Sequence, residues 1–293
     1  MSRKKWIAAA IAVLLGLSVL AAVIAVDRTP AAKTADVVIL MYHAFTEDEA
    51  ETSAVCTLAS EFDRQLSALR DAGYTSVGYA DLIKFVNGSG KLPEKPLLIS
   101  IDDGYRNNLD LAAPLLEKYG FCANIAVIGV SIGHTTYKDS DVPIMPHFSL
   151  EDVRPWIRRG VLTVTTHSYD MHQLASVDGE GCRRGVLQKS GESEADYIAA
   201  LTQDYTVAQE QLDDLPGKPL PVFTYPYGAY SELSERVLHE LGVQVTVTTA
   251  SGANRLVRDE PESLYLLRRI NVPAGTEPDA LIRSISDALQ ALN

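Results

Sequence analysis

Short apolar runs alternate with amphipathic stretches along the chain from about residue 37. Continuous apolar segments, typical of buried strands, cover 37–41, 97–101, 121–128, 161–166, 222–225, 243–248 and 265–272. Apolar residues at helical spacing predict helices over 60–73, 109–119, 149–160, 192–215, 231–241 and 278–292. Buried strands that alternate with helices predict an α/β fold with a parallel sheet, either open and doubly wound or closed into a barrel.

Local signals mark several helix ends and two long loops. Ser60 with Asp63 resembles a capping box, and Ser149 is expected to cap the helix that follows it. The polar loops 131–147 and 176–191 carry no regular pattern. They are expected either to shape a substrate site or to be tolerated insertions.

The start of the chain has a different pattern. Residues 6–26 carry no charge and are long enough to span a bilayer, and the preceding tail, 1–5, is basic. A basic tail favours a cytoplasmic N-terminus, which places the rest of the chain outside the cell membrane. We expect a linker over 27–35 and an exported domain over 36–293. We expect a single-pass membrane anchor. The alternative is a cleaved signal peptide and a secreted domain, because 23–25 is an acceptable cleavage site.

Composition and charge narrow the function classes. The chain is 46% apolar and 22% charged, which allows a large core. Its 26 Lys and Arg against 38 Asp and Glu give a net charge of −12, and the two Arg-Arg pairs are too short for a basic patch, so no nucleic-acid partner is expected. Three cysteines without C-x-x-C spacing predict neither a disulfide framework nor a thiolate zinc site. The oligomeric state stays open.

Two adjacent carboxylates, Asp102 and Asp103, follow the strand predicted over 97–101 and precede Gly104. Ligands gather at the carboxyl ends of parallel strands. Neighbouring carboxylates repel, which raises the pKa of one of them unless a cation lies close by. A bound metal ion resolves this conflict. A turn with a helix cap is the alternative interpretation.

Two histidines, His167 and His172, follow the strand predicted over 161–166. Their spacing puts them about 140° apart on a helix and on opposite faces of a strand, so only a loop can direct both at one atom. Neutral imidazole is the commonest metal ligand. Together with the Asp pair, the histidines form an Asp-His-His set with open positions, as catalytic zinc sites have. Taken alone, the histidine pair is more typical of a surface loop than of a metal site.

Four segments follow one another at predicted strand ends: Met-Tyr-His at 41–43, Ser-Ile-Asp-Asp-Gly-Tyr at 100–105, His-Ser through His at 167–172 and Phe-Thr-Tyr-Pro-Tyr-Gly at 223–228. In this order they resemble the motifs of the polysaccharide deacetylases, carbohydrate esterase family 4 with its NodB-homology domain, over roughly 37–293. The histidine spacing resembles that of the poly-N-acetylglucosamine deacetylase branch. The resemblance implies a distorted (β/α) barrel.

The resemblance also implies a role for each matching residue. Asp103, His167 and His172 would bind a divalent metal ion, most often Zn²⁺. Asp102 would be the general base that takes a proton from the attacking water. The backbone N–H of Tyr227 would help to hold the oxyanion that forms at an acetamide carbonyl.

Two features of the family pattern are missing at their usual places. Thr224 stands where an arginine orients the base, and 266–271 contains no histidine to protonate the leaving amine. We therefore expect His43, at the end of the first strand, to be the general acid; a buried histidine satisfied by a backbone carbonyl is the alternative. Three other histidines are expected to be incidental: His134, His147 and His239.

The sequence thus predicts a membrane-anchored, extracytoplasmic, metal-dependent hydrolase. It would remove N-acetyl groups from N-acetylhexosamine residues of a cell-envelope polysaccharide, peptidoglycan or poly-N-acetylglucosamine-like, with the membrane and this polysaccharide as its partners. Two alternatives are a catalytically impaired glycan-binding relative, because the arginine and C-terminal histidine are missing, and an O-acetyl esterase that uses the same site.

Overall fold

The computed structural model describes residues 32–138 and 140–292 of the chain. The predicted tail and membrane segment, 1–26, lie outside these residues. Within the described part, none of the helices is both long and apolar enough to cross a bilayer. The compact unit that contains the sheet begins at Thr34.

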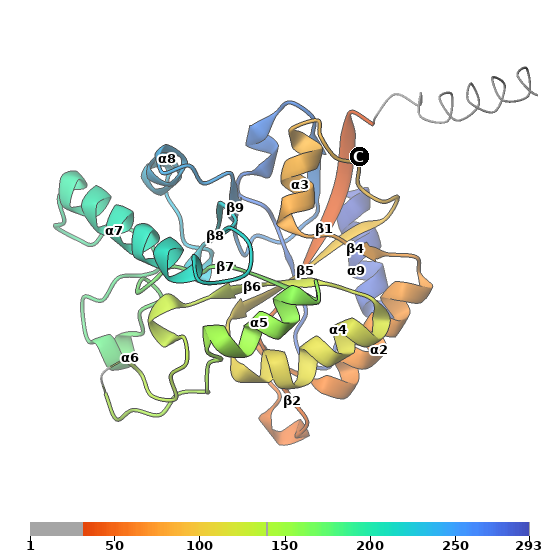
Figure 1. The fold of residues 1–293 in the computed structure, drawn as a ribbon, viewed down its shortest axis with the longest axis horizontal. Coiled ribbons are helices and arrows are strands. Elements are labelled where there is room, and N and C mark those ends of the chain that lie inside the picture. The colour runs from red at the N-terminus through yellow and green to blue at the C-terminus, as the bar shows by residue number, and fades with distance from the viewer. Residues whose placement is uncertain (1–31, 139, 293) are drawn as a thin grey trace, which may run out of the picture. The chain divides into compact units, whose positions relative to one another are not determined.

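A curled, mainly parallel sheet forms the centre of this unit (Figure 1). Its strand order is β10-β1-β5-β6-β7-β8-β9, with β4 paired to β5 and β11 paired to β1. The strands are β1 Thr34–Tyr42, β4 Thr75–Ser76, β5 Pro96–Asp103, β6 Ala123–Val127, β7 Leu162–Thr166, β8 Val222–Thr224, β9 Val245–Val247, β10 Asn254–Val257 and β11 Ile270–Asn271. A separate small sheet pairs β2 Ala44–Thr46 with β3 Cys56–Leu58.

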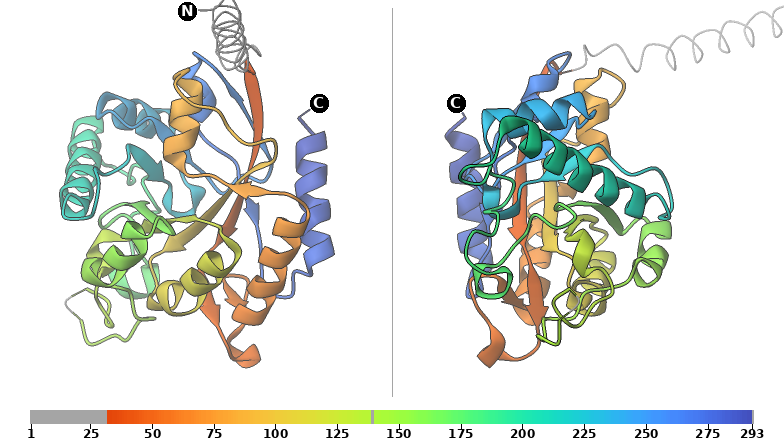
Figure 2. Two further views of the ribbon diagram at one scale, coloured as in Figure 1. Left: turned by 45° about the vertical axis from the view of Figure 1, so that its right-hand side comes forward. Right: turned by 90° about the vertical axis from the view of Figure 1, so that its left-hand side faces the viewer.

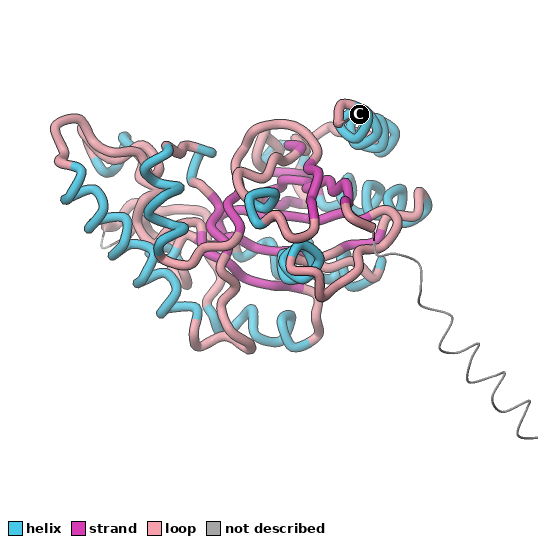
Figure 3. The backbone as a smooth tube through the Cα atoms, turned by 90° about the horizontal axis from the view of Figure 1, so that it is seen from above, coloured by secondary structure: helices cyan, strands magenta, loops and turns pink. Residues whose placement is uncertain are grey.

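Helices surround the sheet, which is seen between them from above in Figure 3. They are α2 Ala59–Asp71, α3 Tyr79–Val86, α4 Ala113–Tyr119, α5 Leu150–Arg158, α6 Ala175–Asp178, α7 Glu194–Leu212, α8 Glu232–Glu240 and α9 Pro278–Gln290. A π-helical turn, Asn108–Ala112, leads into α4, and short 3₁₀ helices occur at Glu49–Glu51, Gly129–Ser131, Pro226–Gly228 and Pro261–Leu264. Figure 2 shows α9 beside α2 on one flank and α7 beside α8 on the other.

Alternate side chains of β1 enter two separate cores. Val38 and Leu40 belong to the core that includes α2, α4 and α9, whereas Val37 and Ile39 belong to the core that includes α3. This alternation is what the period of two of a strand dictates when both faces are covered. It explains why β1 and β5 are continuous apolar runs.

The sheet's two ends approach each other near β11. Leu267 forms an isolated parallel bridge with Val247 of β9, and Ile270 pairs with Leu40 of β1. The structure therefore confirms the predicted α/β class, with a curled half-barrel rather than a complete (β/α) barrel. Because Leu266 has a left-handed φ of 54°, the strand predicted over 265–272 is reduced to two residues.

Most of the other predicted elements are present. Ser149 caps α5, and α4 ends at Gly120, whose φ is 71°. The prediction of a Ser60–Asp63 capping box is wrong. Helix α2 already begins at Ala59, and its N-cap residue, Leu58, makes no side-chain cap hydrogen bond. The pattern also missed α3 and β10, which are only 8 and 4 residues long and too short to show a clear period.

Candidate active site

Three of the predicted site segments turn sharply where their strands end. Asp103 at the end of β5, Ser168 after β7 and Tyr227 after β8 have left-handed φ values of 72°, 72° and 59°. They are half of the six non-glycine residues with positive φ in the described part of the chain. Such strained backbone costs of order 1–3 kcal/mol per residue and clusters at functional sites. The three turns therefore mark the carboxyl edge of the sheet as the candidate site.

Two glycines make these turns possible. Gly228 has a φ of 65°, and a Cβ placed on it would lie 2.1 Å from Oγ1 of Thr249. Gly104, with a φ of 87°, would bring a Cβ to 2.9 Å from Cγ1 of Val127. The glycine after Asp103 and the one after Tyr227 are thus required by space as well as by φ.

Asp103, His167 and His172 come together at this edge. Nε2 of each histidine lies 3.7 Å from Oδ1 of Asp103, and one ligand atom from each of the three residues falls within 4.8 Å of the others. Asp103 and His167 are buried, and Oδ1 of Asp103 has no hydrogen-bond partner among the described residues. A buried carboxylate oxygen without a partner is costly unless a cation or donor occupies the space in front of it.

The Nδ1 atoms of both histidines are already engaged. Nδ1 of His167 lies 2.8 Å from the carbonyl oxygen of Thr224, which only an Nδ1–H can satisfy. Nδ1 of His172 lies 3.1 Å from Oη of Tyr227, and that hydroxyl donates to the carbonyl of Gln173 at 2.9 Å. The hydroxyl therefore accepts from Nδ1–H of His172. Both rings then present an Nε2 lone pair toward Asp103, which is the arrangement that metal-ligating histidines adopt.

Burial keeps His167 neutral. It lowers the pKa of His167 to about 4, against the opposing effect of Asp102. Metal binding requires a neutral imidazole. The donor set, its tautomers and the unpartnered Asp103 oxygen all fit a divalent ion of the kind that accepts nitrogen and oxygen ligands.

Asp102, the residue before Asp103, forms a buried ion pair. Its Oδ1 accepts a hydrogen bond from Nη1 of Arg269 at 2.7 Å, and its Oδ2 lies 3.9 Å from Nε2 of His43. Burial raises the pKa of Asp102, but Arg269, followed by His167 and His43, outweighs burial and leaves the pKa below its usual value. Asp102 is thus ionised at neutral pH.

Arg269 corrects the expectation that no arginine orients Asp102. The guanidinium is fully buried; its Nε donates to the Thr248 carbonyl at 2.8 Å and its Nη1 also donates to Oγ of Ser100 at 3.1 Å. The arginine comes from just before β11 rather than from the Thr224 position. An arginine pair, Arg268-Arg269, inside an otherwise apolar, strand-like run was the sequence signal that could have revealed it.

His43 lies at the opposite side of Asp102 from Arg269. It stands between β1 and β2, and its backbone carbonyl accepts a hydrogen bond from Nδ2 of Asn108 at 2.7 Å. Its side chain is 17% exposed. The imidazole therefore reaches Asp102 on one side while solvent reaches it on the other.

His147, which was expected to be incidental, lies beside the site. Its ring packs 4.8 Å from that of Tyr105, and neither ring nitrogen has a hydrogen-bond partner in the described part of the chain. Burial lowers the pKa of His147 to about 4, against the effect of Asp103. His239 instead stacks on Tyr265. Neither His239 nor His134 belongs to the Asp-His-His cluster.

A curled α/β sheet that carries an Asp-His-His cluster and an adjacent ionised carboxylate at its carboxyl edge defines a hydrolase of the water-activating kind. The comparisons narrow this class. A family model described as polysaccharide deacetylase matches residues 89–246. The chain belongs to the polysaccharide deacetylase family, as its four motifs predicted, and is an enzyme of that hydrolase class.

Individual relatives agree with this assignment. YxkH of Bacillus subtilis (strain 168), which is named as a polysaccharide deacetylase, is 27% identical over 249 residues, 85% of this chain and 75% of that protein. The poly-beta-1,6-N-acetyl-D-glucosamine N-deacetylase of Escherichia coli (strain K12) is 22% identical over 228 residues, which cover 73% of this chain and 34% of that protein. This chain therefore matches only about a third of the E. coli enzyme.

A solved structure shares the fold. A de-N-acetylase from Aggregatibacter actinomycetemcomitans superposes with a TM-score of 0.73 at 20% identity, covering 85% of this chain and 100% of that one. The curled sheet is thus the fold of deacetylase structures.

Proposed function

We propose that this chain is a polysaccharide N-deacetylase, which hydrolyses the acetamide of N-acetylhexosamine residues in a cell-envelope polysaccharide such as peptidoglycan or poly-N-acetylglucosamine. Family membership and the relatives named as N-deacetylases support the reaction. The observation that carries the proposal is the convergence of Asp103, His167 and His172 beside the ionised Asp102.

Asp103, His167 and His172 would hold a divalent ion. An Asp-His-His set with open positions is typical of Zn²⁺, which when bound polarises a carbonyl and lowers the pKa of water. The remaining chemistry falls to the chain's own side chains.

Asp102 and His43 divide the proton transfers in this proposal. The Asp102 carboxylate takes a proton from the attacking water while the oxygen of that water adds to the acetamide carbonyl carbon. Arg269 keeps that carboxylate ionised and fixes its Oδ1, so that Oδ2 is the oxygen left for the proton. Protonated His43 then gives its proton to the amine nitrogen as the C–N bond breaks, which yields acetate and a free amino sugar.

The backbone N–H of Tyr227 would hold the developing oxyanion. Removing one such donor costs about 2.7–4 kcal/mol in enzymes that use one. The left-handed φ of Tyr227 and the crowding at Gly228 support this assignment, because both fix the direction of the turn.

Export and membrane anchoring through 6–26 are part of the proposal. The charge-free stretch of the sequence after a basic tail supports them.

The test is acetate release by the purified full chain from an N-acetylglucosamine oligomer and from an O-acetylated xylan oligomer, with metal content measured in parallel. We expect acetate and free amine from the N-acetylated oligomer. Acetate from the xylan alone would favour the O-acetyl esterase, and glycan binding without turnover would favour the impaired relative. The ion pair of Arg269 with Asp102 removes one of the two reasons for expecting impairment.

The role of His43 has its own test. The His43→Ala variant should lose the limb of the pH–rate profile that reports the general acid, with a rate about 10²–10⁴-fold lower. An unchanged rate at all pH values would remove His43 from the mechanism. His134→Ala, which changes an exposed histidine, is the matched control.

A further inference from the structure

Asp204 is a buried carboxylate that the mechanism above does not use. It lies on α7 within the apolar stripe that contains Tyr197, Leu201, Tyr205 and Ala208, and it is only 7% exposed. A charged residue on the buried face of a helix is unfavourable unless it satisfies specific partners. Burial indeed raises the pKa of Asp204 to about 6.

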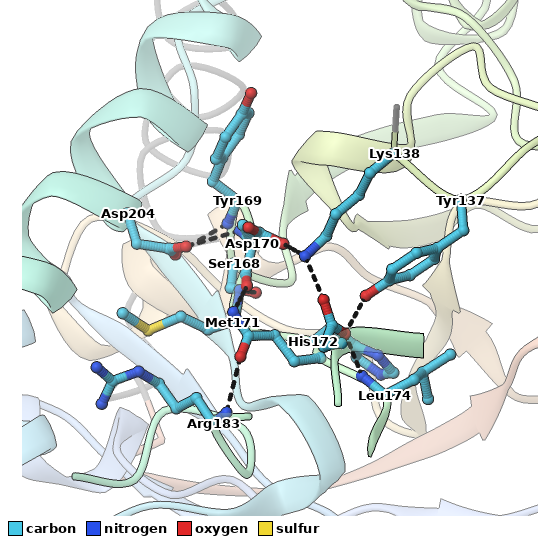
Figure 4. Close-up of polar contacts among 12 residues, drawn as sticks. Tyr137, Lys138, Ser168, Tyr169, Asp170, Met171, His172, Leu174, Arg183 and Asp204 are labelled. Atoms are coloured by element: carbon cyan, nitrogen blue, oxygen red, sulfur yellow. Dashed lines mark hydrogen bonds and ion pairs between the residues drawn. The ribbon is translucent and has the colours of Figure 1, made fainter. Parts of the chain in front are cut away.

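The hydrogen-bond partners of Asp204 are two backbone amides that lie between His167 and His172 in the chain (Figure 4). Tyr169 N–H donates to Oδ1 at 2.9 Å and Asp170 N–H donates to Oδ2 at 2.7 Å. These residues follow the end of β7, where no further strand pairing provides acceptors. One side chain therefore replaces the hydrogen bonds that a helix or sheet would supply there.

The conformation of this turn decides where His172 points. His167 is fixed by the sheet edge, because its N–H donates to the Val127 carbonyl at 2.8 Å. Between it and His172 the chain passes through the left-handed Ser168, whose Oγ accepts from Met171 N–H at 3.1 Å. Asp204 holds the two amides in the middle of this path.

A second contact holds the turn from the other side. Nζ of Lys138 lies 2.7 Å from Oδ1 of Asp170 (Figure 4). The same Nζ lies 2.7 Å from Oδ1 of Asp178. The side chain of Asp170 is 38% exposed, so this ion pair is screened by solvent. Asp204, which is buried and binds backbone, is the stronger restraint.

We propose that Asp204 is a positioning residue that holds the 168–171 turn so that His167 and His172 can bind one metal ion. The inference rests on the proposed function, because it assumes that the two histidines share an ion. Supporting groups of this kind typically change metal affinity by 10–100-fold when mutated.

The test uses Co²⁺ as the probe, bound to the full chain, because its visible absorption reports ligand geometry without any turnover. Asp204→Asn keeps the size of the side chain but presents one NH₂ group to an amide N–H. We expect about 10-fold weaker Co²⁺ binding, about 100-fold for Asp204→Ala, and an altered absorption spectrum in both. Glu210→Gln, an exposed carboxylate on the same helix, is the matched control and should bind as the wild type does.

Each other outcome decides against the proposal. Wild-type affinity and spectrum in Asp204→Asn would overturn the positioning role alone. An Asp204→Asn chain that does not fold would make Asp204 a stability element instead. A wild-type chain that binds no Co²⁺ would overturn this inference, and the same chain's failure to release acetate would then reject the proposed function separately.

Discussion

The two halves of the candidate metal site are built in different ways. Asp102 and Asp103 are the last residues of β5, and pairing with Ala126 and Val127 of β6 fixes their backbone directly. His172 lies six residues beyond the last residue of β7, and side chains from α7 and from the turn after β8 position it. The carboxylate half thus depends on the sheet, whereas in the histidine half the position of His172 depends on a few polar side chains.

This difference predicts two kinds of mutational effect. Changes around the carboxylate half should alter the free energy of unfolding, because they leave charge buried in the core. Changes around the histidine half should alter metal affinity and leave the fold nearly intact. The following variants test this separation.

The largest effect is expected at Arg269. The Arg269→Met variant leaves the buried Asp102 carboxylate without its partner, and breaking a buried pair typically costs about 3–5 kcal/mol. We expect the free energy of unfolding, measured by urea denaturation, to fall by that amount. Arg268→Met changes the adjacent, exposed arginine and should stay within about 0.5 kcal/mol of the wild type. Equal losses in the two variants would contradict the buried-pair account.

His147 predicts a pH dependence of stability. The pKa of His147 in the folded protein is about 4, below the ordinary value of 6.5. The unfolded chain therefore takes up a proton first as the pH falls from 6.5 to 4, and this lowers the free energy of unfolding. The loss over this window should reach up to about 3 kcal/mol in the metal-free protein. His147→Gln should therefore lose less stability on acidification than the wild type. Parallel curves for the two proteins would show that His147 is not buried in its neutral form.

The smallest effect is expected at Tyr227. Tyr227→Phe keeps the backbone N–H and the ring but removes the hydroxyl that accepts from Nδ1–H of His172. We expect Zn²⁺ affinity, measured by calorimetry, to fall about 10-fold with little change in stability. Tyr230→Phe is the matched control, since both tyrosines are 43% exposed. A large stability loss without an affinity change would invert the proposed separation.

The same difference explains what could be predicted from the sequence. Asp102 and Asp103 were predictable because an apolar strand runs straight into them, and position at a strand end is a local property. Arg269 was not, because its partner Asp102 lies 167 positions earlier and only the curl of the sheet brings them together. Asp204 was equally hidden, although a single carboxylate in the apolar stripe of α7 was a usable signal.

The histidine pair was predictable only in part. Their spacing excluded a helix or strand as the common support, and the resemblance to the deacetylases completed the set. The tautomers depend on the Thr224 carbonyl and the Tyr227 hydroxyl, which lie more than 50 positions away in the chain. Long-range contacts of this kind leave no local pattern.

The most direct test of the account is the position of one bound zinc ion, located by anomalous X-ray scattering from crystals of the Zn²⁺-loaded protein. The account predicts one ion per chain, in contact with a carboxylate oxygen of Asp103 and with Nε2 of both His167 and His172. An ion bound elsewhere, or a structure in which these three side chains do not share it, would contradict the central claim.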